Sequence, residues 1–316
     1  MRVRAHVLSL EGLEYVVFAA KVSQGRVVGM DSAQLREYIG EIRQSTGKIY
    51  YWMLSSVVHG HPAMDYENLL EHVTVRVFIE APRYITHQIV RHRLASYVQE
   101  SQRYTEARLV NLIKELAEKV GIECGSSGPD VGEAVAEEAA RRLGEEELRS
   151  ILGRHMGCVR ADPATVLRAV AEYWRARGRG KPPQEAREIL PQCIESQIYM
   201  TVNLRELLHI ASQRLSARAQ PEHARIWARI WRELWEGRRV PGAPRIPTAH
   251  LLLFKSPRTY TEATGAGLIH TVEDEEEIWR EMTPEQRQYL ASAAGWPVSS
   301  RIGTPSSPAT RRRMLS

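Results

Sequence analysis

The sequence predicts an α+β fold, because stretches with the period of a strand are followed by stretches with the composition and period of helices. The clearest strand lies at 73–79, where Val or Ile occupies every second position. Helices are expected at 32–42 and within 132–152, a stretch rich in Ala, Glu and Arg. An apolar share of 43% over 316 residues is enough for a sizeable core.

The N-terminal part leads to a basic triplet, RHR, at 91–93, through a series of expected strands and helices. Short apolar segments precede the helix at 32–42, and a second helix is expected at 51–58. The strand at 73–79 then runs toward the triplet, and the apolar spacing across 82–90 is closer to that of a helix. We therefore expect RHR to lie at or just past a helix end.

The middle of the chain is expected to be helical. Within 108–181, the GSSGPD stretch is a loop signal, and Asp162-Pro163 is a typical cap and first turn of a further helix. The stretch 196–218 is expected to form one long helix. At about 100° per residue, such a helix would project Asn203 and Arg214 together and place Arg205 and His209 on another face.

The chain changes character beyond residue 238. VPGAPRIP has the composition of a linker, TPEQ at 283–286 predicts a capping box that begins a short helix, and the basic segment 299–316 lacks a periodic apolar face. We expect that tail to be disordered. The expected organisation is a main domain at 1–238 and an extension at 239–316.

Composition narrows the class of protein. The net charge of +5 suits anionic ligands without identifying one. There is no apolar run of about 18 residues and no signal-peptide pattern, which predicts a cytoplasmic protein with no membrane partner. Neither GxGxxG after a strand nor a P-loop occurs. The three cysteines, Cys124, Cys158 and Cys193, lack CxxC spacing and are expected to be reduced thiols. His59 and His61 lack further ligands at metal-binding spacing, so no metal is expected.

The basic triplet stands at the head of a donor-rich stretch. Arg91, His92 and Arg93 are followed after seven residues by Ser101, and Arg and hydroxyl donors at this density suit a phosphorylated ligand. A bare basic triplet is more often a solvated face or a nonspecific polyanion patch. A second block follows downstream, in AREILP at 186–191, TVNLRELLHIASQR at 201–214 and AQPEHAR at 219–225.

Together the two blocks resemble the flavin-dependent thymidylate synthases, which methylate dUMP with FAD, NADPH and methylenetetrahydrofolate. The resemblance covers roughly 20–225, with a gap across 108–181 that makes those helices an expected insertion. It implies helices packed on a central antiparallel sheet, and a homotetramer whose sites are shared between subunits. FAD is then the expected cofactor, NADPH and methylenetetrahydrofolate the co-substrates, and dUMP the substrate.

The resemblance also implies residue roles. Arg214 would bind the uracil ring and stabilise the charge that develops when carbon 5 becomes a nucleophile. The implied dUMP contacts are Gln88, Arg91, Gln99, Glu100, Ser101, Gln102, Arg103, Arg187 and Arg214. The implied FAD contacts are Asn68, Arg91, His92, Arg93, Gln99, Asn203, Arg205 and His209.

One segment departs from the family pattern. The family shows Ser or Thr shortly before a Glu-His pair, whereas this chain has Asn68-Leu69-Leu70 before Glu71-His72. Asn68 would then replace a hydroxyl as a flavin contact.

Two alternatives remain from the sequence. One is an FAD and nucleotide binder of the same fold without methylation activity. The other is a nucleic-acid-binding protein that uses RHR and the RRR at 311–313, although no specific nucleic acid is expected.

Overall fold

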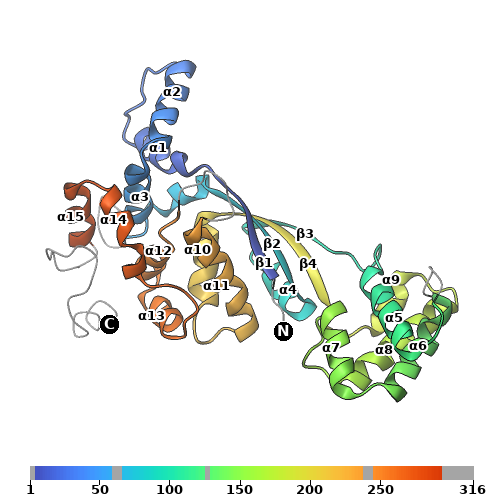
Figure 1. Ribbon diagram of the computed structural model, residues 1–316. Helices are drawn as coiled ribbons and strands as arrows, with labels where there is room; N and C mark the ends of the chain where they lie inside the picture. Colours follow the sequence, from blue (N-terminus) through green and yellow to red (C-terminus); the bar gives the residue numbers. More distant parts are fainter. Residues whose placement is uncertain (1–3, 59–65, 125–128, 238–244, 294–316) are drawn as a thin grey trace. The chain divides into compact units, whose positions relative to one another are not determined.

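The structure, a computed structural model, describes residues 4–58, 66–124, 129–237 and 245–293 (Figure 1). Its described strands form one four-stranded sheet in the order β1-β2-β4-β3. The strands are β1 (Arg4–Glu11), β2 (Thr74–Pro82), β3 (Ala95–Gln99) and β4 (Glu195–Asn203).

The central strand pair is antiparallel. Beyond the end of β4, the Leu204 amide donates to the Val73 carbonyl before β2 begins, over 2.9 Å. Beyond the end of β2, the Arg83 amide donates to the Ile194 carbonyl before β4 begins, also over 2.9 Å. Each strand therefore starts where the other ends. The predicted α+β class with an antiparallel sheet is confirmed.

The predicted single helix at 196–218 is wrong. Its first part is β4, in which Ile198, Met200 and Val202 are buried at every second position, and only Leu204–Arg214 is helical (α10). The alternation satisfies the period of a strand, and pairing with β2 stabilises it in that form. Asn203 ends the strand and caps α10, so it does not share a helix face with Arg214.

The described residues divide into two compact units. Of the described residues, the first unit comprises Arg4 and those within 79–91 and 97–199, and the second comprises those within 5–78 and 92–96 and from 200 onward. The helical elements of the first unit are α4 (Arg83–Ile89), α5 (Ala107–Val120), α6 (Pro129–Arg142), α7 (Glu145–His155), α8 (Pro163–Gly178), α9 (Pro183–Ala186) and η2 (Arg187–Ile189).

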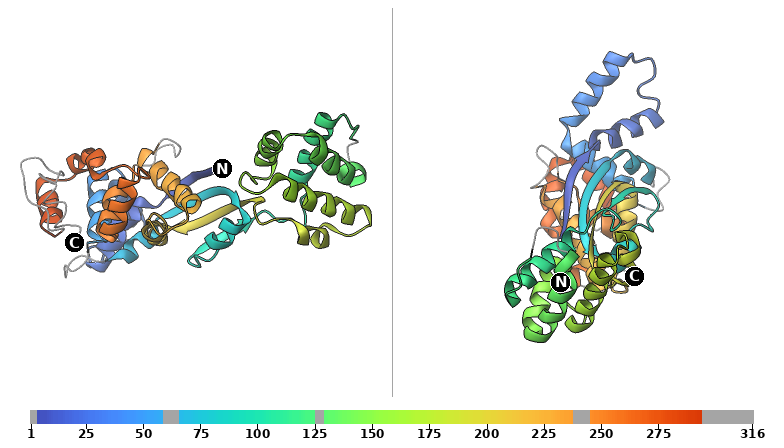
Figure 2. Two further views of the ribbon diagram at one scale, coloured as in Figure 1. Left: turned by 90° about the horizontal axis from the view of Figure 1, so that it is seen from below. Right: turned by 90° about the vertical axis from the view of Figure 1, so that its right-hand side faces the viewer.

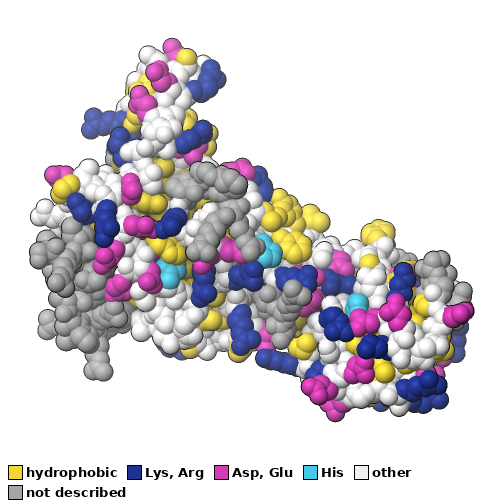
Figure 3. Space-filling model, viewed as in Figure 1, with side chains coloured by type: hydrophobic (Ala, Val, Ile, Leu, Met, Phe, Trp, Pro, Cys, Tyr) yellow, Lys and Arg dark blue, Asp and Glu magenta, His cyan; other side chains and the backbone are white. Residues whose placement is uncertain are grey.

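Helices α5 to α8 of the first unit enclose a core of their own (Figure 2). Leu116, Ile151 and Trp174 are among its buried side chains. The Asp162 carboxylate accepts the Thr165 amide over 2.8 Å at the start of α8, which confirms the predicted cap. Charged side chains of both signs cover the visible outer face of these helices (Figure 3). That these helices form an insertion stays a prediction.

The expectation of three reduced thiols is wrong for two of them. Cys158 and Cys193 form a disulfide with a Cα–Cα distance of 5.0 Å, whereas Cys124 is free. The two are 35 residues apart in the chain. A hydrogen bond of 2.8 Å from the Glu195 amide to the Met156 carbonyl draws the loop after α7 against the start of β4. The spacing of the two cysteines in the sequence does not predict that they lie close enough to form a disulfide.

The second unit holds the remaining helices. The predicted helix at 32–42 is confirmed as α2, with a capping box between Asp31 and Gln34, whereas the helix predicted at 51–58 begins earlier and ends earlier, as α3. The elements before β4 are α1 (Leu13–Ser23), α2 (Ser32–Arg43), α3 (Thr46–Ser55) and η1 (Glu67–His72). Those after α10 are α11 (Pro221–Glu236), α12 (Thr248–Lys255), α13 (Pro257–Gly265), η3 (Val272–Glu275), α14 (Glu276–Glu281) and α15 (Pro284–Ala293).

The segment after residue 239 contains the predicted short helix and several more. Mutual hydrogen bonds between Thr283 and Gln286 confirm the capping box at the start of α15. Helices α12 and α13 lie beside α10 (Figure 1). The predicted linker largely, and the predicted disordered tail wholly, lie outside the described residues. No described helix is long and apolar enough to cross a membrane.

A buried carboxylate holds this C-terminal segment together. Glu275 is fully buried and accepts the Ala249 amide over 2.8 Å, the His250 ring over 2.7 Å and the His270 ring over 2.6 Å. Although burial alone disfavours the charge, these imidazole hydrogen bonds lower the pKa of Glu275 below its usual value. The carboxylate thus joins α12 to the turn before α14.

Glu275→Gln is expected to lower the free energy of unfolding by on the order of 3 kcal/mol, because the amide cannot satisfy every buried donor that faces the carboxylate. Chemical denaturation at pH 7.5 measures the change. The half-exposed Glu276→Gln is the control, with an expected change within about 0.5 kcal/mol. Equal effects of the two substitutions would contradict the assigned role of Glu275.

Candidate functional site

Arg214, at the end of α10, is held beside His92 in the second unit. Its Nε donates to Nε2 of His92 over 3.3 Å, and His92 is only 8% exposed. The partly buried guanidinium has no carboxylate ion-pair partner among the described residues. Burial accordingly lowers the pKa of Arg214. The structure thus presents a cation whose charge no carboxylate side chain of the described chain balances.

His92 is neutral at physiological pH. Burial first, and then the nearby charges of Arg214 and His209, lower the pKa of His92 to about 4. Because Nε2 accepts from Arg214, the ring proton belongs on Nδ1, which faces the Glu206 carboxylate at 3.7 Å. Burial raises the pKa of Glu206. A neutral imidazole therefore orients Arg214 without neutralising it.

His223 was not identified from the sequence. It lies on α11, is fully buried, and neither ring nitrogen has a hydrogen-bond partner within the described part of the chain. Its ring lies 6.0 Å from that of Trp227, which in turn lies 6.3 Å from the ring of His92. Burial first, and then Arg214 and His92, lower the pKa of His223 to about 3. The only sequence signal was its place within AQPEHAR.

The start of α10 carries several predicted flavin contacts. Asn203 caps the helix by accepting the Glu206 amide over 2.8 Å, which occupies the side-chain oxygen. Arg205 and His209 are exposed on one face of α10, as predicted. Arg205 pairs with Glu71 and lies 3.6 Å from Glu67.

The segment that departs from the family pattern is η1. Asn68 is exposed there, between Glu67 and the buried Leu69. The Lys255 amine of α12 donates to Glu67 over 2.5 Å. The structure therefore brings η1, Arg205 and α12 together through Glu67. Arg93, the remaining predicted flavin contact of this unit, is exposed just after His92.

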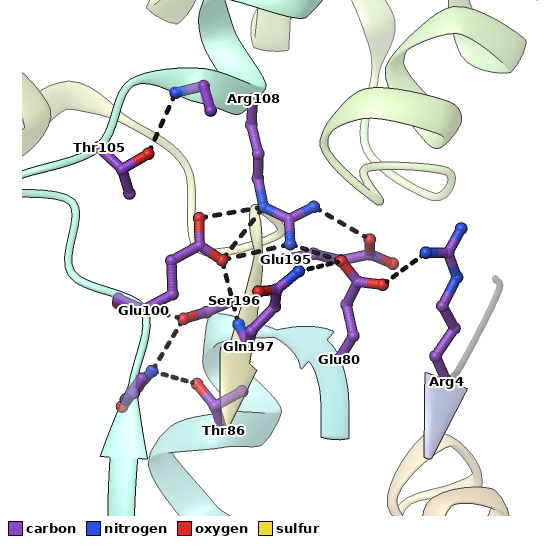
Figure 4. Close-up of polar contacts among 11 residues, drawn as sticks. Arg4, Glu80, Thr86, Glu100, Thr105, Arg108, Glu195, Ser196 and Gln197 are labelled. Atoms are coloured by element: carbon purple, nitrogen blue, oxygen red, sulfur yellow. Dashed lines mark hydrogen bonds and ion pairs between the residues drawn. The ribbon is translucent and has the colours of Figure 1, made fainter. Parts of the chain in front are cut away.

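In the first unit, Gln99 ends β3, and Glu100, which follows it, faces the start of β4 (Figure 4). Gln99 donates to Thr86 over 2.9 Å and to Ser196 over 3.2 Å. The Glu100 carboxylate accepts the Gln197 amide over 3.1 Å. Both predicted side chains are thus fixed by neighbours, and Gln99 directs its amide nitrogen at two hydroxyl groups.

Arg108 gathers three carboxylates beside these residues (Figure 4). It lies 2.5 Å from Glu80, 3.2 Å from Glu100 and 3.7 Å from Glu195. Although burial alone raises the pKa of Glu80, the Arg108 hydrogen bond lowers it below its usual value. Burial, and then the charge of Glu80, raise the pKa of Glu195 to about 7. Arg108 therefore fixes the orientation of Glu100, a predicted nucleotide contact.

The other predicted dUMP contacts of the first unit lie on short helices and on the turns beside them. Ser101 Oγ accepts the Arg103 amide over 3.2 Å, and the Arg103 guanidinium donates to Gln184 over 3.3 Å. Gln102 and Arg187 line a small cavity together with Glu100 and Arg108. The remaining two lie on or just after α4, with Gln88 partly buried and Arg91 exposed.

Arg83 was also missed by the sequence. It begins α4. Burial first, and then the positive charge of Arg187, lower the pKa of Arg83. Two guanidinium groups that feel each other's charge suit a dianionic group. Among the described residues there is no group of three or more His, Cys, Asp or Glu side chains that could hold a metal ion.

The two buried histidines predict that acid destabilises the protein. An unfolded histidine titrates near pH 6.5, so between about pH 6.5 and 4 the unfolded chain takes up protons that folded His92 does not. Titration of the two histidines should therefore lower stability as pH falls through that window, whereas the raised pKa of Glu195 acts in the opposite sense. Arg214 and His209 disfavour the charged ring, and Glu206 opposes them only weakly because burial raises its own pKa.

Urea denaturation at pH 7.5 and 5.0 measures this slope. His92→Gln should reduce the loss of stability between the two pH values, whereas replacing the exposed His87 with Gln should leave it unchanged. An unaltered slope in the His92 variant would show that His92 titrates normally in the folded state.

His223→Leu is expected to raise the free energy of unfolding by about 1 kcal/mol, because it removes a buried polar ring with no partner and keeps a similar volume. Thermal and urea denaturation at pH 7.5 test this. His87→Leu at an exposed site is the control. Loss of stability in the His223 variant would mean that the imidazole has a hydrogen-bond partner in solution.

Comparison with known proteins identifies a family model and several related sequences that match the chain. A family model described as thymidylate synthase complementing protein matches residues 8–237. A flavin-dependent thymidylate synthase of Aeropyrum pernix is 31% identical over 238 residues, covering 67% of this chain and 68% of the relative. A flavin-dependent thymidylate synthase of Pyrococcus furiosus is 34% identical over 158 residues, covering 50% and 52%. The chain thus spans about two thirds of the first relative and about half of the second.

A solved structure of thymidylate synthase X from Helicobacter pylori with FAD and dUMP is 16% identical, with a TM-score of 0.48. The match covers 79% of this chain and 97% of the other. A score below 0.5 adds no weight, so membership rests on the sequence matches. Because the family model spans most of the chain and includes both motif blocks, the chain belongs to the flavin-dependent thymidylate synthase family.

Proposed function

We propose that this protein catalyses the reductive methylation of dUMP to dTMP. Methylenetetrahydrofolate is the proposed carbon donor, and FAD reduced by NADPH the proposed hydride donor. The observation that carries the proposal is Arg214, a partly buried guanidinium without a carboxylate partner among the described residues, held by a neutral His92. It lies within the second of the two blocks that place the chain in its family.

The chemistry of the reaction calls for such a cation. Carbon 5 of uracil becomes nucleophilic when the ring takes on enolate character, and a fixed guanidinium stabilises the negative charge that develops. A carboxylate paired with Arg214 would cancel part of that field. Arg214 donates to a neutral acceptor, the His92 ring. The same unit also contains the two buried ring nitrogens of His223, which have no hydrogen-bond partner among the described residues.

The proposed phosphate contacts lie in the first unit. Arg91, Ser101, Arg103 and Arg187 offer guanidinium and hydroxyl donors, which a phosphate dianion favours. Gln88, Gln99, Glu100 and Gln102 complete the proposed dUMP contacts with amide and carboxylate groups. The orientation of Gln99 and Glu100 by Thr86, Ser196 and Arg108 supports a preformed binding surface.

The residues proposed for FAD fit the group in their chemistry. Arg93, Arg205 and His209 are exposed donors, suited to a pyrophosphate and to a flavin ring that becomes anionic on reduction. Asn68 is exposed as well, and Asn203 retains its amide nitrogen as a donor. Arg91, His92 and Gln99 complete the proposed set. When bound, FAD would supply the hydride, and these side chains would bind and orient it.

A homotetramer with shared sites is also proposed. Leu94 lies just before the edge strand β3 and Val98 lies on it, and they are 71% and 69% exposed. Hydrophobic side chains are grouped over the strands on the visible face (Figure 3). An outer strand with exposed apolar side chains suits association with further copies of the chain. Light scattering coupled to gel filtration measures the assembly directly.

The proposed reaction predicts that purified protein converts dUMP to dTMP under anaerobic conditions with FAD, NADPH and methylenetetrahydrofolate. Chromatography should find dTMP with tetrahydrofolate, because the flavin and not the folate supplies the hydride. Bound, reducible flavin without dTMP would instead favour the non-methylating binder and direct attention to Asn68. Salt-sensitive oligonucleotide binding without flavin would favour the nucleic-acid alternative.

Arg214→Ala is expected to lower the rate of dTMP formation by at least about 100-fold while FAD stays bound, because its proposed partner is the uracil ring. Single-turnover kinetics and flavin absorbance measure the two effects separately. The exposed Arg229→Ala on α11 is the matched control and should retain activity. Normal turnover by the Arg214 variant would remove this residue from the mechanism.

A further inference from the structure

Helix α13 contacts α10 and the turn that follows it on both sides of Arg214. The Thr259 hydroxyl donates to the Ser212 carbonyl over 2.8 Å, two residues before Arg214. The Glu262 carboxylate accepts the Ala217 amide over 2.8 Å, three residues after Arg214. Both side chains belong to one helix of the second unit, and both act on backbone atoms.

The Thr259 contact satisfies a carbonyl in the last turn of α10. Such carbonyls lack a helical partner of their own and need another donor. Thr259 is only 4% exposed, and its oxygen accepts the Ser256 hydroxyl over 2.9 Å, which leaves its own proton for Ser212. The direction of this hydrogen bond is therefore fixed.

The Glu262 contact holds the turn beyond the helix. The Ala217 amide first, and then Arg258 at 2.9 Å, lower the pKa of Glu262. Its carboxylate is therefore charged at neutral pH and accepts both groups. Between the two anchored backbone atoms lies Leu215, which is 1% exposed and so anchors the backbone next to Arg214 as well.

We propose that α13 is a positioning element for Arg214, acting through Thr259 and Glu262. The matched family model ends at residue 237, so this role belongs to a segment that the motif blocks do not include. The inference rests on the proposed function for the part that Arg214 plays toward dUMP. The positioning itself is a property of the folded chain and can be measured without the reaction.

Thr259→Val removes the donor and keeps the side-chain shape. In the FAD-loaded protein it should raise the Kd for dUMP about fivefold, as measured by calorimetry, and lower kcat, while the Kd for FAD changes less than about twofold. Thr259→Ser restores the hydroxyl and should restore dUMP binding. Thr261→Val is the control, because that exposed hydroxyl bonds only to Pro257 of its own helix.

Hydrogen exchange provides the readout that does not depend on activity. In Glu262→Ala the amide of Ala217 should lose protection, detected by mass spectrometry of fragments that separate Ala217 from Gln213, while amides in the middle of α10 keep theirs. Should Thr259→Val fail to fold, this variant and Thr259→Ser carry the test through the same measurements.

The outcomes separate the two proposals. Wild-type protein that makes no dTMP, with unprotected Ala217 in Glu262→Ala, would overturn the proposed function but keep the positioning contact. Active wild-type protein, with dUMP binding unchanged in Thr259→Val, would overturn the positioning role. Equal loss in Thr259→Val and Thr261→Val would also overturn it, since the effect would then belong to α13 in general.

Discussion

The second unit contains a cation, Arg214, that has no carboxylate partner among the described residues and is held in place by a neutral histidine. Arg214 is charged and partly buried, and its close partner His92 does not balance that charge, because burial and the nearby cation keep the imidazole neutral. A charged imidazole would repel the guanidinium, and a carboxylate would neutralise it. The pair thus preserves a positive field, which a developing anionic ring can use.

Helix α10 carries Arg214, and contacts at both ends hold this helix in place. Its start is tied to β4 without a loop, with Asn203 ending the strand and capping the helix. Its end is held by Thr259 and Glu262 from α13, and α13 belongs to a segment anchored by the buried Glu275. One element inside the motif block and one beyond it therefore hold the backbone on either side of Arg214.

The sequence predicted what local pattern and motif can encode. The valines of β2, the Asp162 cap and the position of RHR beyond α4 follow from nearest-neighbour chemistry, and each was predicted. The prediction of a helix at the start of β4 is wrong because its apolar pattern fits both a helix and a strand. Pairing with neighbouring strands, which the sequence does not show, stabilises the strand.

Long-range contacts explain the remaining errors and omissions. The Cys158–Cys193 disulfide and the contacts of α13 with α10 join residues far apart in the chain. The sequence does not predict that His223 is unusual, because its distinguishing feature is that its buried ring nitrogens have no hydrogen-bond partner among the described residues. That feature depends on the folded surroundings. The motif blocks identified the candidate residues, whereas the fold shows which neighbours hold Arg214 and Glu100 in place.

The most direct test of the role of Arg214 is a crystal structure of the protein with FAD and dUMP. The Arg214 guanidinium is expected within hydrogen-bond distance of the uracil ring, with Nε still on His92. Uracil bound elsewhere, with Arg214 paired to a carboxylate, would contradict that role.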